Sequence, residues 1–113
     1  MHEMSLAEGI LQIVESTAQA NDARAVRAVW LELGTLSHVE LDALRFSFDV
    51  VKRGTVAGDA RLEVLSTPGR AWCMPCGDAV DLSRLGDPCP NCGSHQLQVT
   101  QGEEMRVKEI EIA

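Results

Sequence analysis

The four cysteines of this 113-residue chain lie in two Cys-x2-Cys pairs, Cys73 with Cys76 and Cys89 with Cys92. In a Cys-x2-Cys turn the two thiolates converge, and two such turns that face each other form a closed four-sulfur site, which suits a structural zinc ion. Prolines and glycines that favour tight turns complete each motif: Pro75, Gly77, Pro90 and Gly93. The spacing therefore predicts a zinc-ribbon-like module over residues 68–101.

Three other states of the cysteines are considered: two disulfides, four buried free thiols, and a rubredoxin-like iron site with the same spacing. Disulfides need an oxidising compartment, and residues 1–5 lack the basic and apolar regions of a secretory signal, so we expect a cytoplasmic protein. Free thiols among prolines, with few aliphatic neighbours, would make a poor core. An iron site is disfavoured because the loop lacks a shielding aromatic shell. Zinc is the favoured reading.

Size and charge narrow the class of protein. The length allows one domain, or a small core with a metal-stapled module, and no apolar run approaches the roughly 20 residues of a membrane span. The formal net charge is −7. Around the cysteines, Arg70 and Arg84 are outnumbered by Asp78, Asp81 and Asp87, whereas a nucleic-acid-binding ribbon would carry a basic stripe. A cation or a basic protein surface is the expected partner, and nucleic acid is not.

No pattern in the chain indicates an enzyme. There is no Ser/His/Asp set and no phosphate-binding loop, and a site with four cysteine ligands leaves no position for a catalytic water. We therefore expect a protein without catalytic activity.

The hydrophobic pattern predicts helix, strand, helix and strand before the cysteines, and one strand after them. A helix is expected over 5–19 behind a Ser5–Glu8 capping box, and a second helix is expected behind a Ser37–Glu40 capping box, ending near Gly54. Strands are expected over 25–33, 60–66 and 103–112.

This order predicts an α+β fold, with two helices on a small mixed three-stranded sheet and an inserted zinc-ribbon-like module. The last strand is expected to return to the first sheet. The predicted domains are 1–67 with 102–113, and 68–101.

The amino terminus carries a second candidate metal site. The Met1 amine, the His2 amide nitrogen and the His2 imidazole lie within a few bonds of one another, and Glu3 adds a carboxylate. Such a nitrogen-rich set suits Ni(II) or Cu(II) better than Mg²⁺ or Ca²⁺. The alternative is a disordered terminus without a ligand role.

The chain resembles the HypA/HybF family over essentially its whole length. The resemblance rests on the Met1-His2-Glu3 start, the double Cys-x2-Cys module and the closing stretch from Gly102 to Glu111. It implies a nickel metallochaperone for [NiFe]-hydrogenase maturation, with a nickel domain made by the helices and sheet and a structural zinc domain. Its partners would be a nickel-handling GTPase and the immature hydrogenase large subunit, and some members of the family serve urease.

By the same resemblance His2 is the principal nickel ligand, and Glu3 is a neighbouring ligand or tunes the partner contact. Glu40 occupies the place of an acidic residue that helps to bind nickel in some members; the competing interpretation is a helix cap. His38 is expected to be a surface residue. His95 is expected to be a surface residue or a donor to a cysteine sulfur, with ligation of the metal as the weaker alternative. We expect a monomer or weak dimer. The alternative function is a zinc-ribbon module for protein interaction or nucleic-acid binding, without nickel.

Overall fold

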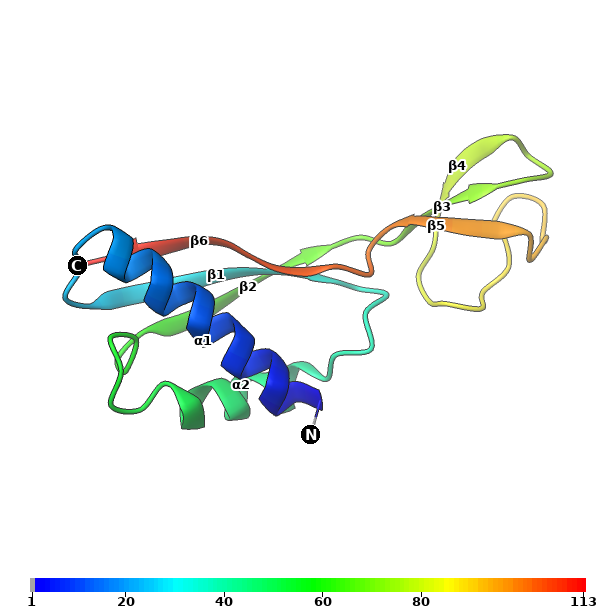
Figure 1. Ribbon diagram of the computed structural model, residues 1–113. Helices are drawn as coiled ribbons and strands as arrows, with labels where there is room; N and C mark the ends of the chain where they lie inside the picture. Colours follow the sequence, from blue (N-terminus) through cyan, green and yellow to red (C-terminus); the bar gives the residue numbers. More distant parts are fainter. Residues whose placement is uncertain (1) are drawn as a thin grey trace. The chain divides into compact units, whose positions relative to one another are not determined.

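The structure is a computed structural model that describes residues 2–113, and the chain divides into two compact units. The first unit comprises the residues up to Leu31, Val39–Val64 and Arg106–Ala113, and the second comprises Glu32–His38 and Leu65–Met105. The elements, in chain order, are α1 (His2–Ala20), β1 (Val26–Gly34), α2 (Leu41–Val51), β2 (Arg61–Thr67), β3 (Arg70–Cys73), β4 (Asp78–Asp81), β5 (Leu97–Gln101) and β6 (Met105–Ile112) (Figure 1). The predicted order of elements is confirmed, and so is the α+β class. No helix within residues 2–113 has the length and apolar character to cross a bilayer.

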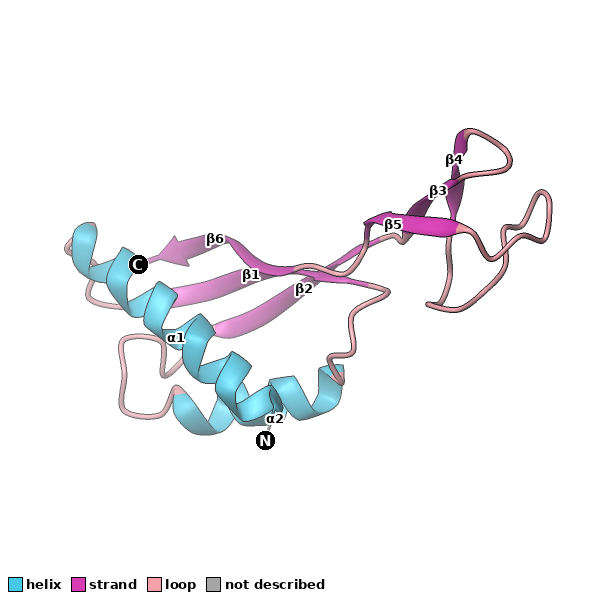
Figure 2. Cartoon of the chain, turned by 45° about the vertical axis from the view of Figure 1, so that its right-hand side comes forward, coloured by secondary structure: helices cyan, strands magenta, loops and turns pink. Residues whose placement is uncertain are grey.

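The first unit is built on the sheet β2-β1-β6. Strands β1 and β2 run in the same direction with α2 between them in the chain, and β6 runs the opposite way, so the sheet is mixed (Figures 1 and 2). The amide of Ala113 donates to the carbonyl of Ala25 at 3.0 Å, which places the end of β6 beside the start of β1. The last strand therefore returns to the first sheet, as predicted.

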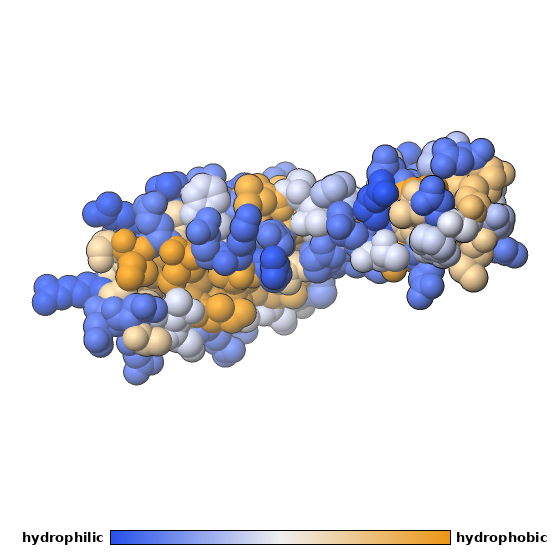
Figure 3. Space-filling view, turned by 90° about the horizontal axis from the view of Figure 1, so that it is seen from above, coloured by the Kyte–Doolittle hydropathy of each residue, from blue (hydrophilic) through white to orange (hydrophobic). Residues whose placement is uncertain are grey.

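Both helices lie on the same face of this sheet and supply its core (Figure 2). The buried side of α1 repeats at helical spacing, and α2 contributes Leu44 and the fully buried Phe48. The buried residues of α1 are Ala7, Ile10, Leu11, Val14 and Ala18. Seen from above, apolar side chains gather on this unit, at the left, among mostly hydrophilic neighbours (Figure 3). Each helix thus packs through one side, while its other side faces away from the core.

The starts of both helices differ from those predicted by the capping boxes. Helix α1 begins at His2, three residues before the expected cap, and Ser5 is an exposed residue inside the helix. Glu3 in the first turn favours the earlier start because its negative charge faces the positive end of the helix dipole. Helix α2 is capped by Glu40 itself, with φ −84° and ψ 112°, so Ser37 is not its cap.

The second unit contains the sheet β4-β3-β5, in which β3 is the central strand and pairs antiparallel with both neighbours. One face of this sheet packs into a small core of buried residues: Leu36, Ala71, Cys73, Val80, Leu82 and Cys89. Leu36 comes from the segment after β1. The predicted bounds place this segment in the domain of residues 1–67 and 102–113. The segment is held by backbone bonds, since the Leu36 amide donates to Gly102 at 2.8 Å and the Thr35 amide donates to Thr67 at 3.0 Å. That the two units act as a nickel domain and a zinc domain stays a prediction.

Gly102 has no room for a side chain. Its φ is +108°, and an added Cβ would lie 2.6 Å from the Cα of Gly69. Both the left-handed backbone and the close approach of another chain segment require glycine here.

Replacing Gly102 with alanine is expected to lower the free energy of unfolding of the second unit by about 2 kcal/mol or more, because left-handed strain of roughly 1–2 kcal/mol adds to a backbone clash. Gly9→Ala is the matched control: Gly9 lies in α1 with nothing within 4 Å of the new Cβ, so the helix should gain about 0.5–1 kcal/mol. Denaturant unfolding of both variants measures the difference. Equal effects from the two changes would contradict the assignment.

Candidate metal centres

The two Cys-x2-Cys turns have the same backbone geometry. The Gly77 amide donates to the Cys73 carbonyl, and the Gly93 amide donates to the Cys89 carbonyl, each at 2.9 Å. Both glycines have positive φ, +61° and +76°, which glycine adopts without strain. The first turn follows directly from β3, which ends at Cys73. The predicted turn role of both glycines is confirmed.

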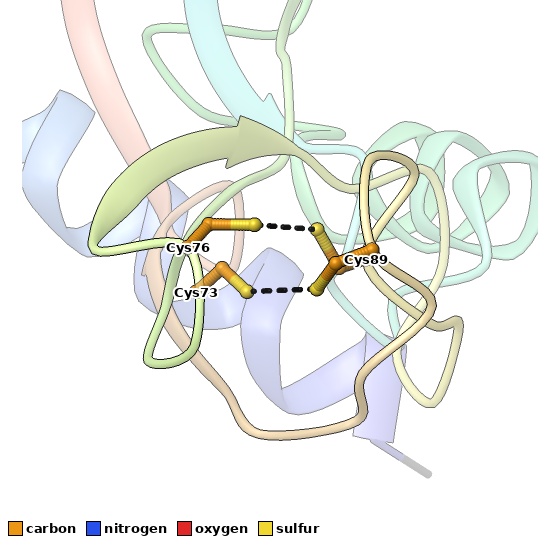
Figure 4. A group of neighbouring side chains, drawn as sticks. Cys73, Cys76 and Cys89 are labelled. Carbon is orange, nitrogen blue, oxygen red and sulfur yellow. Dashed lines mark hydrogen bonds between the residues drawn. The ribbon is translucent and has the colours of Figure 1, made fainter.

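These turns bring the four thiols together (Figure 4). The sulfur atoms of Cys73, Cys76, Cys89 and Cys92 all lie within 4.8 Å of one another. The Cys73 and Cys92 sulfurs are 3.6 Å apart, and those of Cys76 and Cys89 are 4.0 Å apart. A disulfide needs about 2.05 Å, whereas a tetrahedron with Zn–S bonds of about 2.3 Å has edges of about 3.8 Å. The cluster therefore fits a structural zinc ion and is not disulfide-bonded.

The electrostatics of the cluster also favour a cation. Hydrogen bonds with the thiols of Cys92 and Cys73 raise the pKa of Cys76 to about 12. Burial raises the pKa of Cys89, but hydrogen bonds from the amides of Cys92 and Asn91, together with those of the neighbouring thiols, lower that pKa to about 7. Four adjacent thiolates repel one another, so the set ionises fully only when a positive ion compensates their charge.

The cysteine cluster is the only group of three or more His, Cys, Asp and Glu side chains, among residues 2–113, that is placed to share one ion. His95 is exposed and is not a member of this group. A four-cysteine site is already closed for zinc, so the donor set needs no histidine. Two sulfurs, those of Cys73 and Cys89, belong to buried residues, while Cys76 and Cys92 are exposed.

The amino-terminal candidates lie where the two helices of the first unit begin. His2 is exposed in the first turn of α1. The carboxylate of Glu3 accepts a hydrogen bond from the Glu40 amide at 3.3 Å, which joins the first turn of α1 to the cap of α2. The Met1 amine lies outside the described residues.

Glu40 acts as a helix cap in this structure. Its Oε2 atom accepts a hydrogen bond of 2.7 Å from the Ala43 amide. This bond supports the capping interpretation of Glu40, and it occupies one carboxylate oxygen, so the other oxygen is the one through which Glu40 could contact a metal. The structure therefore places Glu3 beside Glu40 and leaves the ligand roles of both as predictions.

The burial of Leu36 and the cleft beside His38 are features that the sequence did not predict. Leu36 belongs to the core around the cysteines. The signal in the sequence is that Leu36 is a lone apolar residue between Gly34 and Ser37, in a segment otherwise suited to a turn. His38 is exposed, as expected, and lines a surface cleft with Arg84.

Comparisons with known proteins agree in their result. The family described as "Hydrogenase/urease nickel incorporation, metallochaperone, hypA" matches residues 1–112. Proteins called hydrogenase maturation factor HypA from Rhodopseudomonas palustris (strain BisA53) and Azotobacter vinelandii are each 56% identical over 112 residues, covering 99% of both chains.

Two solved structures share the fold. The solution structure of the Ni metallochaperone HypA from Helicobacter pylori has a TM-score of 0.70 at 24% identity and covers 97% of this chain and 96% of that one. A second solution structure, of a HypA protein, has a TM-score of 0.75 at 25% identity and covers 100% of this chain and 97% of that one.

Proposed function

This chain belongs to the HypA family of hydrogenase and urease nickel-incorporation metallochaperones, and we propose that it binds Ni(II) at its amino terminus and delivers it during [NiFe]-hydrogenase maturation. The observation that carries the proposal is the hydrogen bond from the Glu40 amide to Glu3, because it holds the turn that contains His2 against the start of α2. The nickel ligands are His2 and Glu3, with the Met1 amine and Glu40 as further candidates.

The helical position of His2 supports a role for its backbone nitrogen. The first four amides of an α-helix have no partner within the helix, and α1 begins at His2. Binding of nickel by the His2 amide nitrogen therefore costs no helical hydrogen bond. Imidazole and amide nitrogens must lose protons to bind the metal, so nickel affinity should weaken as the pH falls.

The two metals have different roles in this proposal. The four cysteines, Cys73, Cys76, Cys89 and Cys92, would hold zinc as a structural ion, which supplies folding free energy to the second unit. Nickel is cargo and has to leave. His2 is exposed, so a partner can approach the nickel without unfolding either core.

The protein acts as a carrier rather than a catalyst in this proposal. Its expected partners are a nickel-handling maturation GTPase and the immature [NiFe]-hydrogenase large subunit, and they meet it in the cytoplasm. The membership of the family and the maturation-factor names of the relatives support this setting.

The function is tested by nickel titration calorimetry of the untagged, zinc-loaded chain beside the same chain with two residues added before Met1. The untagged chain should bind about one nickel ion. The extension replaces the terminal amine with an amide and displaces His2 from the chain end, so it should weaken binding by an order of magnitude or more, because it alters a donor to the metal. An untagged chain that binds no nickel would refute the proposed function, and identical titrations of the two chains would exclude the Met1 amine as a ligand.

A further inference from the structure

Two clefts in the second unit share Thr35 in their lining. The first, here called the Arg84 cleft, has a volume of about 230 Å³ and is lined by Thr35, Leu36, Ser37, His38, Arg84 and Leu85. The second, here called the Ser83 cleft, has a volume of about 380 Å³ and is lined by Thr35, Pro68, Gly69, Asp81, Leu82 and Ser83. Because they share Thr35, they border one another along the segment that precedes α2.

The Arg84 cleft carries cationic and hydrogen-bonding groups that have no partner. Neither Arg84 nor His38 makes a side-chain hydrogen bond or an ion pair within residues 2–113. The second unit contains two arginines, Arg70 and Arg84, against six acidic residues. Arg70 is paired with Asp81. Arg84 is therefore an unpaired cation in an acidic unit, and it lies at a cleft.

We propose that the Arg84 cleft is a docking site for the carboxylate side chain of a partner protein. The Arg84 guanidinium would donate to the carboxylate in a forked geometry, and the Ser37 hydroxyl and the His38 ring can donate further hydrogen bonds. The apolar side chains of Leu36 and Leu85 offer contacts to the methylenes of a glutamate and to an apolar neighbour. This site is independent of nickel and adds a partner surface to the proposed carrier.

Size and charge favour a single carboxylate over other anions. Pockets for whole small molecules measure about 300–1,000 Å³, so a cleft of about 230 Å³ suits one side chain better than a nucleotide. One guanidinium balances the single charge of a carboxylate, whereas a phosphate carries a charge between one and two. The neighbouring Ser83 cleft leaves room for the residues that adjoin the acidic one in an extended partner segment.

NMR titration of the full, zinc-loaded chain without nickel tests the proposal, with acetyl-Leu-Glu-Leu-amide as the probe. The amides of residues 35–38 and 84–86 should shift on addition of this peptide, and acetyl-Leu-Gln-Leu-amide should bind at least roughly fivefold more weakly. Arg84→Gln should weaken binding of the glutamate peptide by a similar factor, as expected for one solvent-open ion pair. Arg53→Gln is the matched control, since Arg53 is also exposed but lies in the first unit, and it should leave binding unchanged.

Three results would overturn the proposal. Equal binding of the two peptides would show that the cleft does not recognise the carboxylate. Inorganic phosphate that shifts the same amides, when the glutamate peptide does not, would replace the carboxylate by phosphate as the ligand. Equal losses in Arg84→Gln and Arg53→Gln would show an effect of net charge and not of the cleft.

Discussion

Replacing Cys73 with serine is expected to unfold the second unit while the first unit stays folded. Structural zinc in zinc-finger peptides supplies roughly 10–16 kcal/mol near neutral pH, which matches the roughly 5–15 kcal/mol that stabilises a whole domain. The core of the second unit cannot replace this energy, because Cys73 and Cys89 are two of its six buried residues. A serine at position 73 removes a thiolate ligand and places a hydroxyl at a fully buried position.

The first unit has a core of its own, built around residues such as Phe48, Leu31 and Leu44, which are fully buried. Helical circular dichroism should therefore persist in Cys73→Ser, while the bound zinc and the dispersed NMR signals of residues 68–101 are lost. Met74→Ala is the matched control, since Met74 lies in the same turn and is 60% exposed. A serine variant that keeps one zinc ion and an ordered second unit would contradict a structural role for the cluster.

The features that the sequence predicted well depend on short-range patterns. The cysteine spacing predicted the cluster of four sulfurs within 4.8 Å, and each Cys-x2-Cys turn is fixed locally by its own glycine and backbone hydrogen bond. The order of helices and strands follows from the apolar periodicity. The return of β6 to the first sheet was expected from the order of elements, and the hydrogen bond from the Ala113 amide to the Ala25 carbonyl bears it out.

The features that the sequence did not predict depend on long-range contacts. A capping box at Ser5 is consistent with the local sequence, but α1 begins at His2, where Glu3 contacts the Glu40 amide 37 residues away. Likewise Leu36 follows β1 in the chain but is buried among residues of the second unit, 71–89. The turn that contains Leu36 is too short to show an apolar periodicity. The sequence therefore does not reveal which of the two cores buries this side chain.

The Glu3–Glu40 contact allows the two roles of Glu3 to be separated. If Glu3 positions the first turn of α1, then Glu3→Gln should keep nickel affinity, because the glutamine carbonyl still accepts from the Glu40 amide. The ligand role proposed for Glu3 predicts instead that Glu3→Gln binds nickel more weakly, because the side chain has lost its negative charge. This variant therefore complements the change at His2, in which the imidazole donor itself is removed.

Replacing His2 with alanine is expected to weaken nickel binding at least about 100-fold, because loss of a hydrogen-bond partner behind a metal ligand already costs 10–100-fold, and here the imidazole donor itself is lost. His2 is exposed and contributes nothing to the core, so zinc content and unfolding temperature should not change. Calorimetric nickel titration of the untagged, zinc-loaded variant measures the affinity. His95→Ala is the matched control, since His95 is also exposed but belongs to the second unit, and it should bind nickel as the parent chain does. Equal nickel affinities of His2→Ala and the parent chain would show that the His2 imidazole is not a nickel ligand. Other donors would then have to bind the nickel.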